Sequence, residues 1–242
     1  MSALLSLSNV TKRFGGLLAV NSMTFDLQEG EVVGLLGPNG SGKTTLINLI
    51  SGALPPTAGS VHVAGKEIAG LRADQIARSG IARTFQLVRI LPSMTVLENV
   101  QVPAAFGAKS HWGGEIDRIA RTCLEQVGIA HLARAMPGDL TYIDQKRLEL
   151  ARALAAEPKV LLLDEWLAGL NPTELQDGIA LIRKLQSTGI TILLVEHIME
   201  AVRALCPRCV VMNAGALIAD GTTEEVLADP NVIAAYLGDS HA

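Results

Sequence analysis

The sequence predicts an α/β fold, and three features of its pattern lead to this prediction. Short strand-like runs alternate with helical segments along the chain, which is typical of mixed α/β proteins. Three runs are almost continuously aliphatic, as in the central strands of a parallel sheet that is covered on both faces: residues 31–36, 160–163 and 190–195. Two stretches alternate between apolar and polar residues, which indicates half-buried strands of an antiparallel portion: Met23, Phe25 and Leu27, then Val61 and Val63.

A helical block is expected between about residues 88 and 157, where no strong strand pattern occurs. A capping box formed by Thr95 and Glu98 opens its first helix. An apolar stripe at helical spacing follows and ends at Gly128; it consists of Ile116, Ile119, Cys123, Leu124 and Val127. The glycine-rich segment 107–114 is expected to be an exposed loop within the block.

Two further helix boundaries can be placed from their capping residues. Pro158 ends a helix that runs from about Thr141. The next helix begins after Asn171, a capping residue, with Pro172 at its first position and Glu174 at its third. The helical block is therefore an insertion in an otherwise α/β chain.

The composition of the 242 residues limits the class of protein. Hydrophobic residues make up 49% of the chain and charged residues only 18%, so intrinsic disorder is excluded. The longest unbroken aliphatic run, Ile190 to Val195, is about a third of what a bilayer-spanning helix needs. The N-terminus has no basic residue ahead of its short, serine-interrupted apolar stretch, so we expect no secretion signal and a cytosolic protein.

Charge and cysteine content narrow the possible partners. With 20 basic and 24 acidic residues the net charge is −4, and there is no basic stripe, so we expect no nucleic-acid partner. Cys206 and Cys209 have the spacing of a redox or zinc half-site, but no second pair or histidine cluster completes a metal set. We therefore expect Cys209 to open a buried strand.

The strongest functional signal directly follows the first aliphatic run. There the chain matches the pattern GxxxxGK[ST] with Gly37, Pro38, Asn39, Gly40, Ser41, Gly42, Lys43 and Thr44. Glycines let backbone N–H groups turn inward around phosphate oxygens, and the helix that continues through Thr45 adds its positive dipole end. Lys43 reaches the β and γ phosphates, and Thr44 offers a hydroxyl to Mg²⁺. The sequence therefore predicts a site for a nucleoside triphosphate.

A second functional signal is an acid pair at the end of a buried strand. Asp164 and Glu165 follow the aliphatic run 160–163, and ligands of open α/β sheets bind beyond the carboxyl ends of strands. Asp164 is suited to hold Mg²⁺ through water, and Glu165 to act as the general base on an attacking water. By itself such a pair is more often a solvated strand end, but the phosphate loop favours the catalytic interpretation.

Taken together, the motifs resemble the ATPases of ATP-binding cassette (ABC) transporters. The phosphate loop, the acid pair, Gln86 in the run ARTFQ and His197 in the run VEH have the order and spacing of that family. The resemblance is closest to the ATPase subunits of branched-chain amino-acid importers. Three runs carry this likeness: RFGGL from Arg13, AGLNP from Ala168 and AYLG from Ala235.

The resemblance implies an architecture and further site residues. It implies a P-loop NTPase (RecA-like) core with an N-terminal antiparallel β-subdomain and an inserted α-helical subdomain that docks on membrane subunits. These would form one ABC ATPase domain over residues 1–242, with the core at 1–87 and 158–242 and the helical subdomain at about 88–157. Three side chains gain implied roles: Phe14 stacks on adenine, Gln86 contacts Mg²⁺ and the attacking water, and His197 senses the γ-phosphate. Without the other motifs, Phe14 would be read as core and the other two as surface polar residues.

One family motif is altered in this chain. Where the family has Leu-Ser-Gly-Gly-Gln, or often Leu-Ser-Tyr-Gly-Gln, this chain has residues 140–144 with the sequence LTYID. In the family this segment approaches the γ-phosphate of ATP held by the opposite subunit. Ile143 places a branched side chain there and Asp144 a negative charge, while Thr141 keeps only the hydroxyl. A smaller departure is Trp166, where the family usually has proline.

These observations lead to an expected function with two alternatives. We expect an ATP-hydrolysing subunit, using ATP and Mg²⁺, of an importer for branched-chain or other amino acids. Because of the altered segment we expect a heterodimer with a homologous ATPase, bound to integral membrane permeases at the cytoplasmic face of the membrane and served indirectly by an extracytoplasmic binding protein. The alternatives are a regulatory ATP-binding subunit whose partner does most of the hydrolysis, and a non-transport ABC ATPase acting on ribosomes or DNA.

Overall fold

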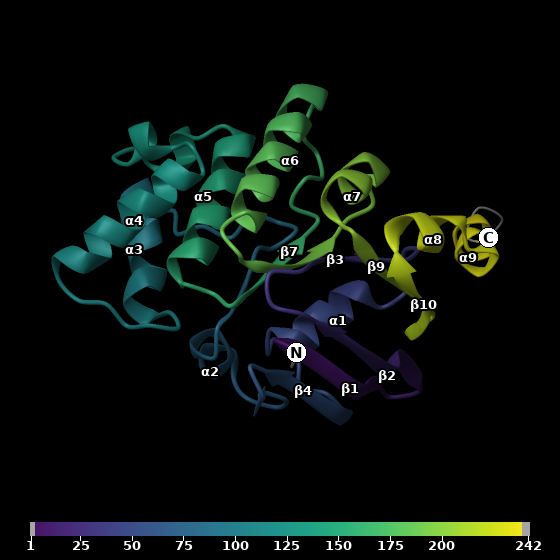
Figure 1. Ribbon diagram of the computed structural model, residues 1–242. Helices are drawn as coiled ribbons and strands as arrows, with labels where there is room; N and C mark the ends of the chain where they lie inside the picture. The colour runs from purple at the N-terminus through teal and green to yellow at the C-terminus, as the bar shows by residue number, and fades with distance from the viewer. Residues whose placement is uncertain (1–2, 239–242) are drawn as a thin grey trace.

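The computed structural model describes residues 3–238 and contains two β-sheets (Figure 1). Residues of both sheets pack into one shared hydrophobic core. The first two and last four residues of the single domain expected over 1–242 lie outside the described residues. Helices α3 to α5 gather at one end of the molecule, and α8 and α9 lie at the other (Figure 1). Helix α1 (Lys43–Ile50) lies between the two sheets.

The larger sheet has six strands in the order β10-β9-β3-β8-β7-β6. Their bounds are β3 Val32–Leu36, β6 Ile81–Arg83, β7 Val160–Asp164, β8 Thr191–Val195, β9 Arg208–Asn213 and β10 Ala216–Thr222. All neighbours pair in parallel except β10, which is antiparallel to β9. The three predicted aliphatic strands are confirmed as the adjacent strands β3, β8 and β7.

These central strands are apolar on both faces because each face packs into a different hydrophobic core. In β7, Leu161 and Leu163 pack with the helices of one side, whereas Val160 and Leu162 pack with α1 and the antiparallel sheet. Every residue of β7 and β8 is buried. This two-sided burial is the physical reason for the continuous aliphatic runs.

The smaller sheet is antiparallel, with the order β2-β1-β4-β5. Its strands are β1 Leu5–Phe14, β2 Leu17–Leu27, β4 Ala58–Val63 and β5 Lys66–Glu67. Met23, Phe25 and Leu27 are buried and alternate with more exposed neighbours, as predicted. Val61 and Val63 of β4 are buried in the same core.

The helical block contains α3 Val96–Phe106, α4 Gly114–Gln126 and α5 Tyr142–Ala155, with two short 3₁₀ turns, Ala130–Leu132 and Pro137–Asp139. The capping box is confirmed: Thr95 accepts a hydrogen bond from the Glu98 N–H, and Glu98 accepts one from the Thr95 N–H at 2.8 Å. Helix α2, Ala73–Arg78, precedes the block.

The remaining helices are α6 Pro172–Gln186, α7 Met199–Leu205, α8 Thr223–Ala228 and α9 Pro230–Gly238. The start of α6 is confirmed, because Asn171 caps it and the Glu174 carboxylate accepts a hydrogen bond from the Asn171 N–H. None of the described helices is both long and apolar enough to cross a bilayer.

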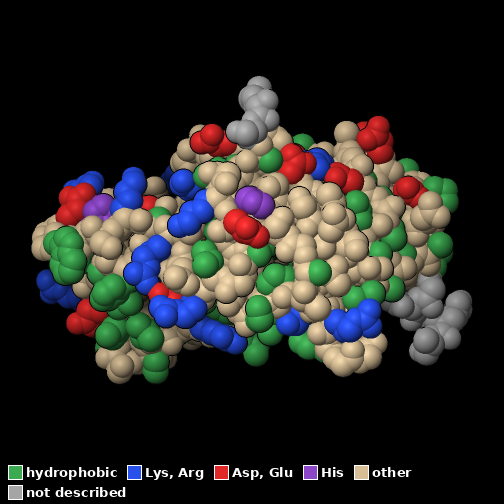
Figure 2. Space-filling view, turned by 90° about the horizontal axis from the view of Figure 1, so that it is seen from below, with side chains coloured by type: hydrophobic (Ala, Val, Ile, Leu, Met, Phe, Trp, Pro, Cys, Tyr) green, Lys and Arg blue, Asp and Glu red, His purple; other side chains and the backbone are tan. Residues whose placement is uncertain are grey.

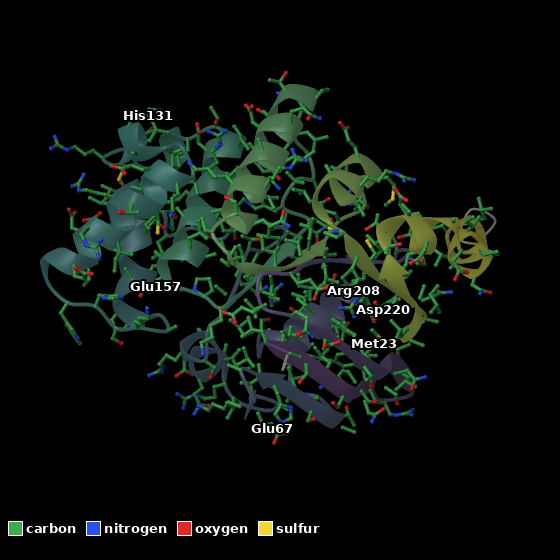
Figure 3. All side chains as sticks on the ribbon, in the orientation of Figure 1. Met23, Glu67, His131, Glu157, Arg208 and Asp220 are labelled. Carbon is green, nitrogen blue, oxygen red and sulfur yellow. The ribbon has the colours of Figure 1, made fainter. Side chains whose placement is uncertain are left out.

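Strand β9 begins at Arg208, one residue before the start expected at Cys209. Cys209 is its second residue and is fully buried. Gly34 of β3 lies directly opposite, and a Cβ atom there would be only 2.9 Å from the Cys209 sulfur. At the mouth of this strand Arg208 pairs with Asp220 of β10 at 2.7 Å, and both side chains lie together in Figure 3. Close packing thus joins β9 to β3, and an ion pair joins β9 to β10.

Candidate functional site

The phosphate loop joins the end of β3 to the start of α1, and two of its glycines are required by close contacts. Gly37 has φ of +146°, and a Cβ atom on it would be 2.1 Å from the carbonyl oxygen of Met212. Gly42 has φ of +105°, and a Cβ atom on it would be 2.4 Å from the carbonyl oxygen of Ala19. Only glycine fits both the backbone conformation and the space at these positions.

The loop presents several N–H groups and one ammonium group. The first turn of α1, which contains Lys43, Thr44 and Thr45, carries N–H groups that have no intrahelical acceptor. The Lys43 ammonium donates to the carbonyl oxygens of Gly37 at 2.7 Å and Pro38 at 2.9 Å. Burial lowers the pKa of Lys43, while Glu165 and Asp164 oppose this shift. The loop therefore has the donors that a phosphate group needs.

Asp164 ends β7 as a buried carboxylate with a buried cationic partner. Its carboxylate lies 3.1 Å from the guanidinium of Arg83, and both side chains are buried. Burial raises the pKa of Asp164, and the Arg83 charge opposes this shift. Arg83 also donates to the side-chain oxygens of Asn48, at 2.7 Å, and Ser51, at 3.0 Å. This network connects the ends of β6 and β7 with the C-terminal part of α1.

Glu165 is held beside Gln86 at the rim of the site. The Gln86 amide donates to the Glu165 carboxylate at 2.8 Å. The Glu165 N–H donates to the carbonyl oxygen of Val195, at the end of β8, over 2.9 Å. Its backbone is left-handed, with φ of +51°, which L residues rarely adopt. The chain therefore turns sharply at the residue expected to be the general base.

Two adjoining hollows meet at Asn39, Gln86 and Glu165. The first, of about 600 Å³, is lined by the loop from Asn39 to Thr45, by Leu17 to Ala19, and by Ala214 and Gly215. The second, of about 450 Å³, is lined in addition by Gly37, Pro38, His197 and Tyr236. The tertiary structure thus brings seven separate segments of the sequence together around these two hollows.

Most of the predicted site residues lie together, and two are set apart. The loop residues, Gln86, Glu165 and His197 line these hollows. Asp164 lies beneath them, with 3% of its surface exposed, and is therefore not a lining residue. Phe14, at the end of β1, is half-exposed beside Lys12, whose ammonium is 5.1 Å from the ring centre, and it lines neither hollow.

Leu17 to Ala19, Ala214 and Gly215 of the first hollow were not predicted from the sequence, and neither were two further residues of the site. Tyr236 of α9 accepts a hydrogen bond from the Gly37 N–H at 2.8 Å, and Arg83 pairs with Asp164. Both residues stand in runs that resemble the family, AYLG and ARTFQ, but neither run indicates the contact. Such contacts depend on elements up to 199 positions apart in the sequence.

The altered segment at the start of α5 forms a closed cap. The Thr141 hydroxyl donates to the Asp144 carboxylate at 2.6 Å, and the Asp144 N–H donates back to the Thr141 oxygen at 3.3 Å. Thr141 and the Tyr142 side chain are exposed, and Asp144 is half-buried. An internal carboxylate therefore occupies the position near a helix N-terminus that an external anion would favour.

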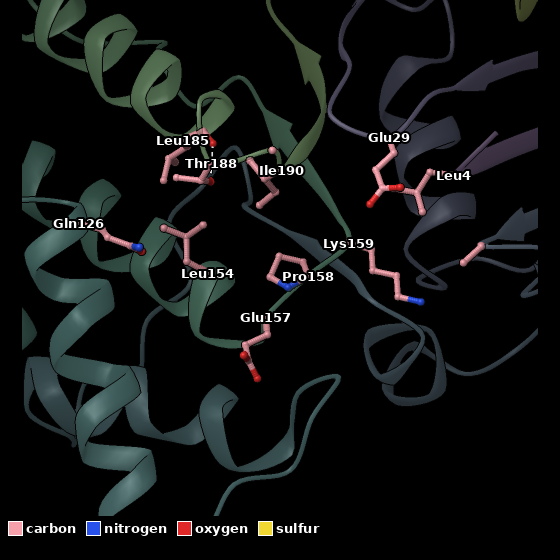
Figure 4. Close-up of a pocket in the computed structure, with 12 residues that line it drawn as sticks. Leu4, Glu29, Gln126, Leu154, Glu157, Pro158, Lys159, Leu185, Thr188 and Ile190 are labelled. Carbon is pink, nitrogen blue, oxygen red and sulfur yellow. Dashed lines mark hydrogen bonds between the residues drawn. The ribbon is translucent and has the colours of Figure 1, made fainter. Parts of the chain in front are cut away.

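A different cavity lies at the opposite edge of the large sheet (Figure 4). Pro158, Lys159 and Ile190, which precede β7 and β8, line its volume of about 560 Å³ together with Leu154 and Glu157. The carboxyl ends of these strands, where Glu165 lies, face the other way. This cavity is therefore separate from the phosphate loop.

The family follows from comparison with known proteins. A family model described as ABC transporter matches residues 20–168, which include the phosphate loop, Gln86 and Glu165. The chain belongs to the ABC transporter family. A second model, described as branched-chain amino acid ATP-binding cassette transporter, matches residues 216–242 of this ABC transporter chain.

Individual relatives of this ABC ATPase agree with the family. The chain is 42% identical to the high-affinity branched-chain amino acid transport ATP-binding protein BraF of Pseudomonas aeruginosa, over 98% of each chain. A crystal structure of an ATP-binding cassette of an ABC transporter in its ADP conformation superposes with a TM-score of 0.89 and 33% identity, over 98% of this chain and 100% of that one. A dimeric bacterial ABC transporter cassette has a TM-score of 0.81 and 29% identity, over 90% and 98%. The chain is therefore an ATPase with the nucleotide-binding P-loop fold of ABC cassettes.

Proposed function

We propose that this chain hydrolyses ATP to drive the import of branched-chain amino acids, as one ATPase subunit of a transporter. The observation that carries the catalytic part is the contact between Gln86 and Glu165 at the rim of the phosphate-loop hollow. The solute is supported by the name of the BraF relative and by the second family model.

Each predicted site residue has a role in this proposal. The loop from Gly37 to Thr45 binds the phosphates through its N–H groups, and Lys43 leaves its internal carbonyl partners to reach the β and γ phosphates. Glu165 takes a proton from the attacking water. His197 contacts the γ-phosphate, and the Phe14 ring, with 44% of the residue's surface exposed, stacks on adenine.

The residues that would hold Mg²⁺ fit that ion because all three offer oxygen donors. They are the hydroxyl of Thr44, the amide oxygen of Gln86 and the carboxylate of Asp164, which binds through water. When bound, the ion neutralises charge on the phosphate oxygens. The charge of Arg83 favours the ionised form of Asp164, which is the form that binds a cation, against the effect of burial.

Membrane permeases are the second partner in this proposal, which places the chain at the cytoplasmic face of the membrane as a peripheral subunit. We propose the helical subdomain over about residues 88–157 as the docking part. A groove of about 490 Å³ separates it from the core and is lined by Phe85, Arg89 and Ile90, among others. Figure 2 shows hydrophobic side chains gathered at the end of the molecule that holds this subdomain, and its exposed apolar residues include Phe106 and Trp112.

The other proposed partner is a homologous ATPase, and the closed cap at Thr141 and Asp144 supports a heterodimer with it. The hydroxyl of Thr141 is already engaged by the Asp144 carboxylate, which would repel the phosphate of a facing ATP. A partner with an unaltered segment would complete the nucleotide site of this chain. The same observation favours a second candidate, a regulatory subunit in which this chain binds ATP and the partner does most of the hydrolysis.

The catalytic proposal is tested with Glu165→Gln. We expect ATP binding to persist while turnover by the assembled complex falls by about a hundredfold or more. Glu67→Gln is the matched control, because Glu67 lies exposed on β5, far from the loop (Figure 3). Near-normal hydrolysis by the Glu165→Gln chain within the complex would favour the regulatory candidate, since the partner would then carry the chemistry.

The heterodimer is tested by light scattering of Glu165→Gln with ATP. The chain alone is expected to stay monomeric, whereas Ile143→Gly with Asp144→Gln should allow a homodimer to form, because the cap is opened and the charge removed. A tight ATP-bound homodimer formed by Glu165→Gln with Ile143 and Asp144 still in place would contradict the proposal.

The solute is tested by uptake in cells whose copy of this gene carries Lys43→Ala. We expect uptake of labelled leucine, isoleucine and valine to be lost while uptake of urea and acetamide is unchanged. The opposite pattern would replace branched-chain amino acids with amides as the solute.

A further inference from the structure

Lys146 is a buried lysine on α5 whose ammonium group is bound by main-chain oxygens. Its exposed fraction is only 2%. The ammonium donates to the carbonyl oxygen of Trp166 at 2.8 Å and to that of Glu165 at 3.4 Å. It also lies 5.1 Å from the ring centre of Tyr142. Within residues 3–238 it forms no ion pair, so these contacts carry the buried charge.

Trp166 also donates a hydrogen bond to Lys146. Its indole N–H donates to the carbonyl oxygen of Lys146 at 3.1 Å, and only 1% of its surface is exposed. Its ring packs against α6 at Gly178, where an added Cβ atom would be 3.3 Å from the ring. Two reciprocal hydrogen bonds therefore join α5 to the residue that directly follows Glu165. We call this pair the latch.

The latch acts on a segment that is held at other points as well. The Glu165 N–H is bound to the Val195 carbonyl, and the Leu167 N–H donates to the Glu196 carboxylate at 2.8 Å. Between these two anchors the backbone of Glu165 has the left-handed conformation that L residues avoid. Such a conformation persists only where its surroundings impose it, and the latch supplies the contacts on the α5 side.

We propose that Lys146 and Trp166 are positioning residues, which hold the Glu165 backbone so that its carboxylate meets Gln86, and which connect this geometry to the helix that begins at Thr141. The inference rests on the proposed role of Glu165 as general base. Helix α5 starts at the cap of Thr141 and Asp144, and Lys146 lies about one turn further on. A displacement of the helix start by a partner subunit is therefore transmitted to Glu165 in the same chain.

The test compares three variants in the assembled complex. Lys146→Met removes the ammonium, Lys146→Arg keeps a donor, and Trp166→Phe removes only the indole N–H. We expect Lys146→Met to lower kcat by about tenfold and Trp166→Phe by about threefold, with the Kd for a fluorescent ATP analogue changed by less than about twofold. Lys146→Arg should recover part of the loss. Lys184→Met, an exposed position on α6, is the control.

A purely structural role would give a different result. It would lower the melting temperature and weaken ATP binding together, and kcat would be normal at temperatures where the variant is folded; that result overturns the proposal. If Lys146→Met does not fold, Trp166→Phe decides in the same way. The Glu165→Gln result separates the two proposals. If Glu165→Gln is active, the proposed catalytic role of Glu165 is wrong. If Glu165→Gln is inactive but kcat is unchanged in the variants of Lys146 and Trp166, only the proposed positioning role of the latch is wrong.

Fluorescence gives an independent readout. The chain has two tryptophans, and Trp112→Phe removes the exposed one, so that Trp166 alone reports. We expect addition of ATP to change the emission of Trp166, and Lys146→Met to abolish that change while the indole stays shielded from acrylamide. An ATP-dependent change that is identical with and without Lys146 would overturn the coupling between α5 and Glu165.

Discussion

The side-chain amide of Gln86 donates a hydrogen bond to the carboxylate of Glu165 over 2.8 Å, although the two residues are 79 positions apart in the sequence. Gln86 follows β6, at the border of the helical block, and Glu165 follows β7. Because β6 and β7 are parallel neighbours, their carboxyl ends bring the two side chains to the same edge of the sheet. A movement of the helical block can therefore reach the proposed general base through one hydrogen bond.

The first prediction concerns this contact. Gln86→Ala should lower kcat by about tenfold while the Kd for ATP changes little, because the variant loses the orientation of Glu165 and one proposed oxygen donor to Mg²⁺ but keeps the phosphate loop. Steady-state hydrolysis and binding of a fluorescent ATP analogue measure the two quantities. Gln176→Ala is a matched control, since Gln176 makes a similar exposed bond to Glu200 away from the site. Unchanged kcat in Gln86→Ala would show that the contact has no catalytic weight.

The second prediction concerns the buried pair of Arg83 and Asp164. Arg83→Met should lower the free energy of unfolding by about 3 kcal/mol, because Asp164 then keeps a buried charge without its partner. Adding Asp164→Asn should recover part of this loss, and urea denaturation measures both variants. Arg121→Met, which breaks an exposed pair with Asp117, should lower the free energy of unfolding far less, because solvent screens that pair. Equal losses for the two arginines would contradict the assignment.

The third prediction concerns Tyr236, which accepts a hydrogen bond from the first glycine of the phosphate loop. Tyr236→Phe keeps the ring and removes the acceptor, so the Gly37 N–H loses its partner. We expect the affinity for ATP to fall by about three- to tenfold, as for the loss of one hydrogen bond, with a stable fold. Isothermal titration calorimetry measures it, with Ile233→Ala, exposed on the same helix, as the control. An affinity equal to that of the wild type would rule out a role of α9 at the loop.

The fourth prediction concerns pH and Glu196. Burial raises the pKa of Glu196, so the native protein keeps this proton to a higher pH than the unfolded chain does. The carboxyl group therefore costs no stability below its ordinary pKa, and the cost grows as the pH rises through the raised value. Glu196→Gln keeps an oxygen for the Leu167 N–H and removes the charge.

We expect Glu196→Gln to exceed the wild type in the free energy of unfolding by about 1 kcal/mol at neutral pH, and the difference to vanish near about pH 4. Urea denaturation across this range measures the difference, and the exposed Glu224→Gln should show no such trend. A difference that is independent of pH would exclude the charge of Glu196 as its cause.

Local pattern was sufficient for much of the fold and for the chemistry of single motifs. Strands β3, β7 and β8 could be predicted because burial on both faces leaves only aliphatic residues, and the starts of α3 and α6 because caps act over three or four residues. The phosphate loop was recognisable because its glycines and lysine serve a chemistry confined to eight consecutive residues.

Tertiary structure alone decided which distant groups meet. Three contacts join residues that are far apart in the sequence, and no local spacing encodes them: Tyr236 with Gly37 (199 positions), Arg83 with Asp164 (81 positions) and Lys146 with Trp166 (20 positions). Trp166 illustrates the difference. In the sequence it is only a departure from proline, whereas in the fold it is a buried donor that ties α5 to Glu165, because packing and hydrogen-bond geometry are properties of the assembled chain.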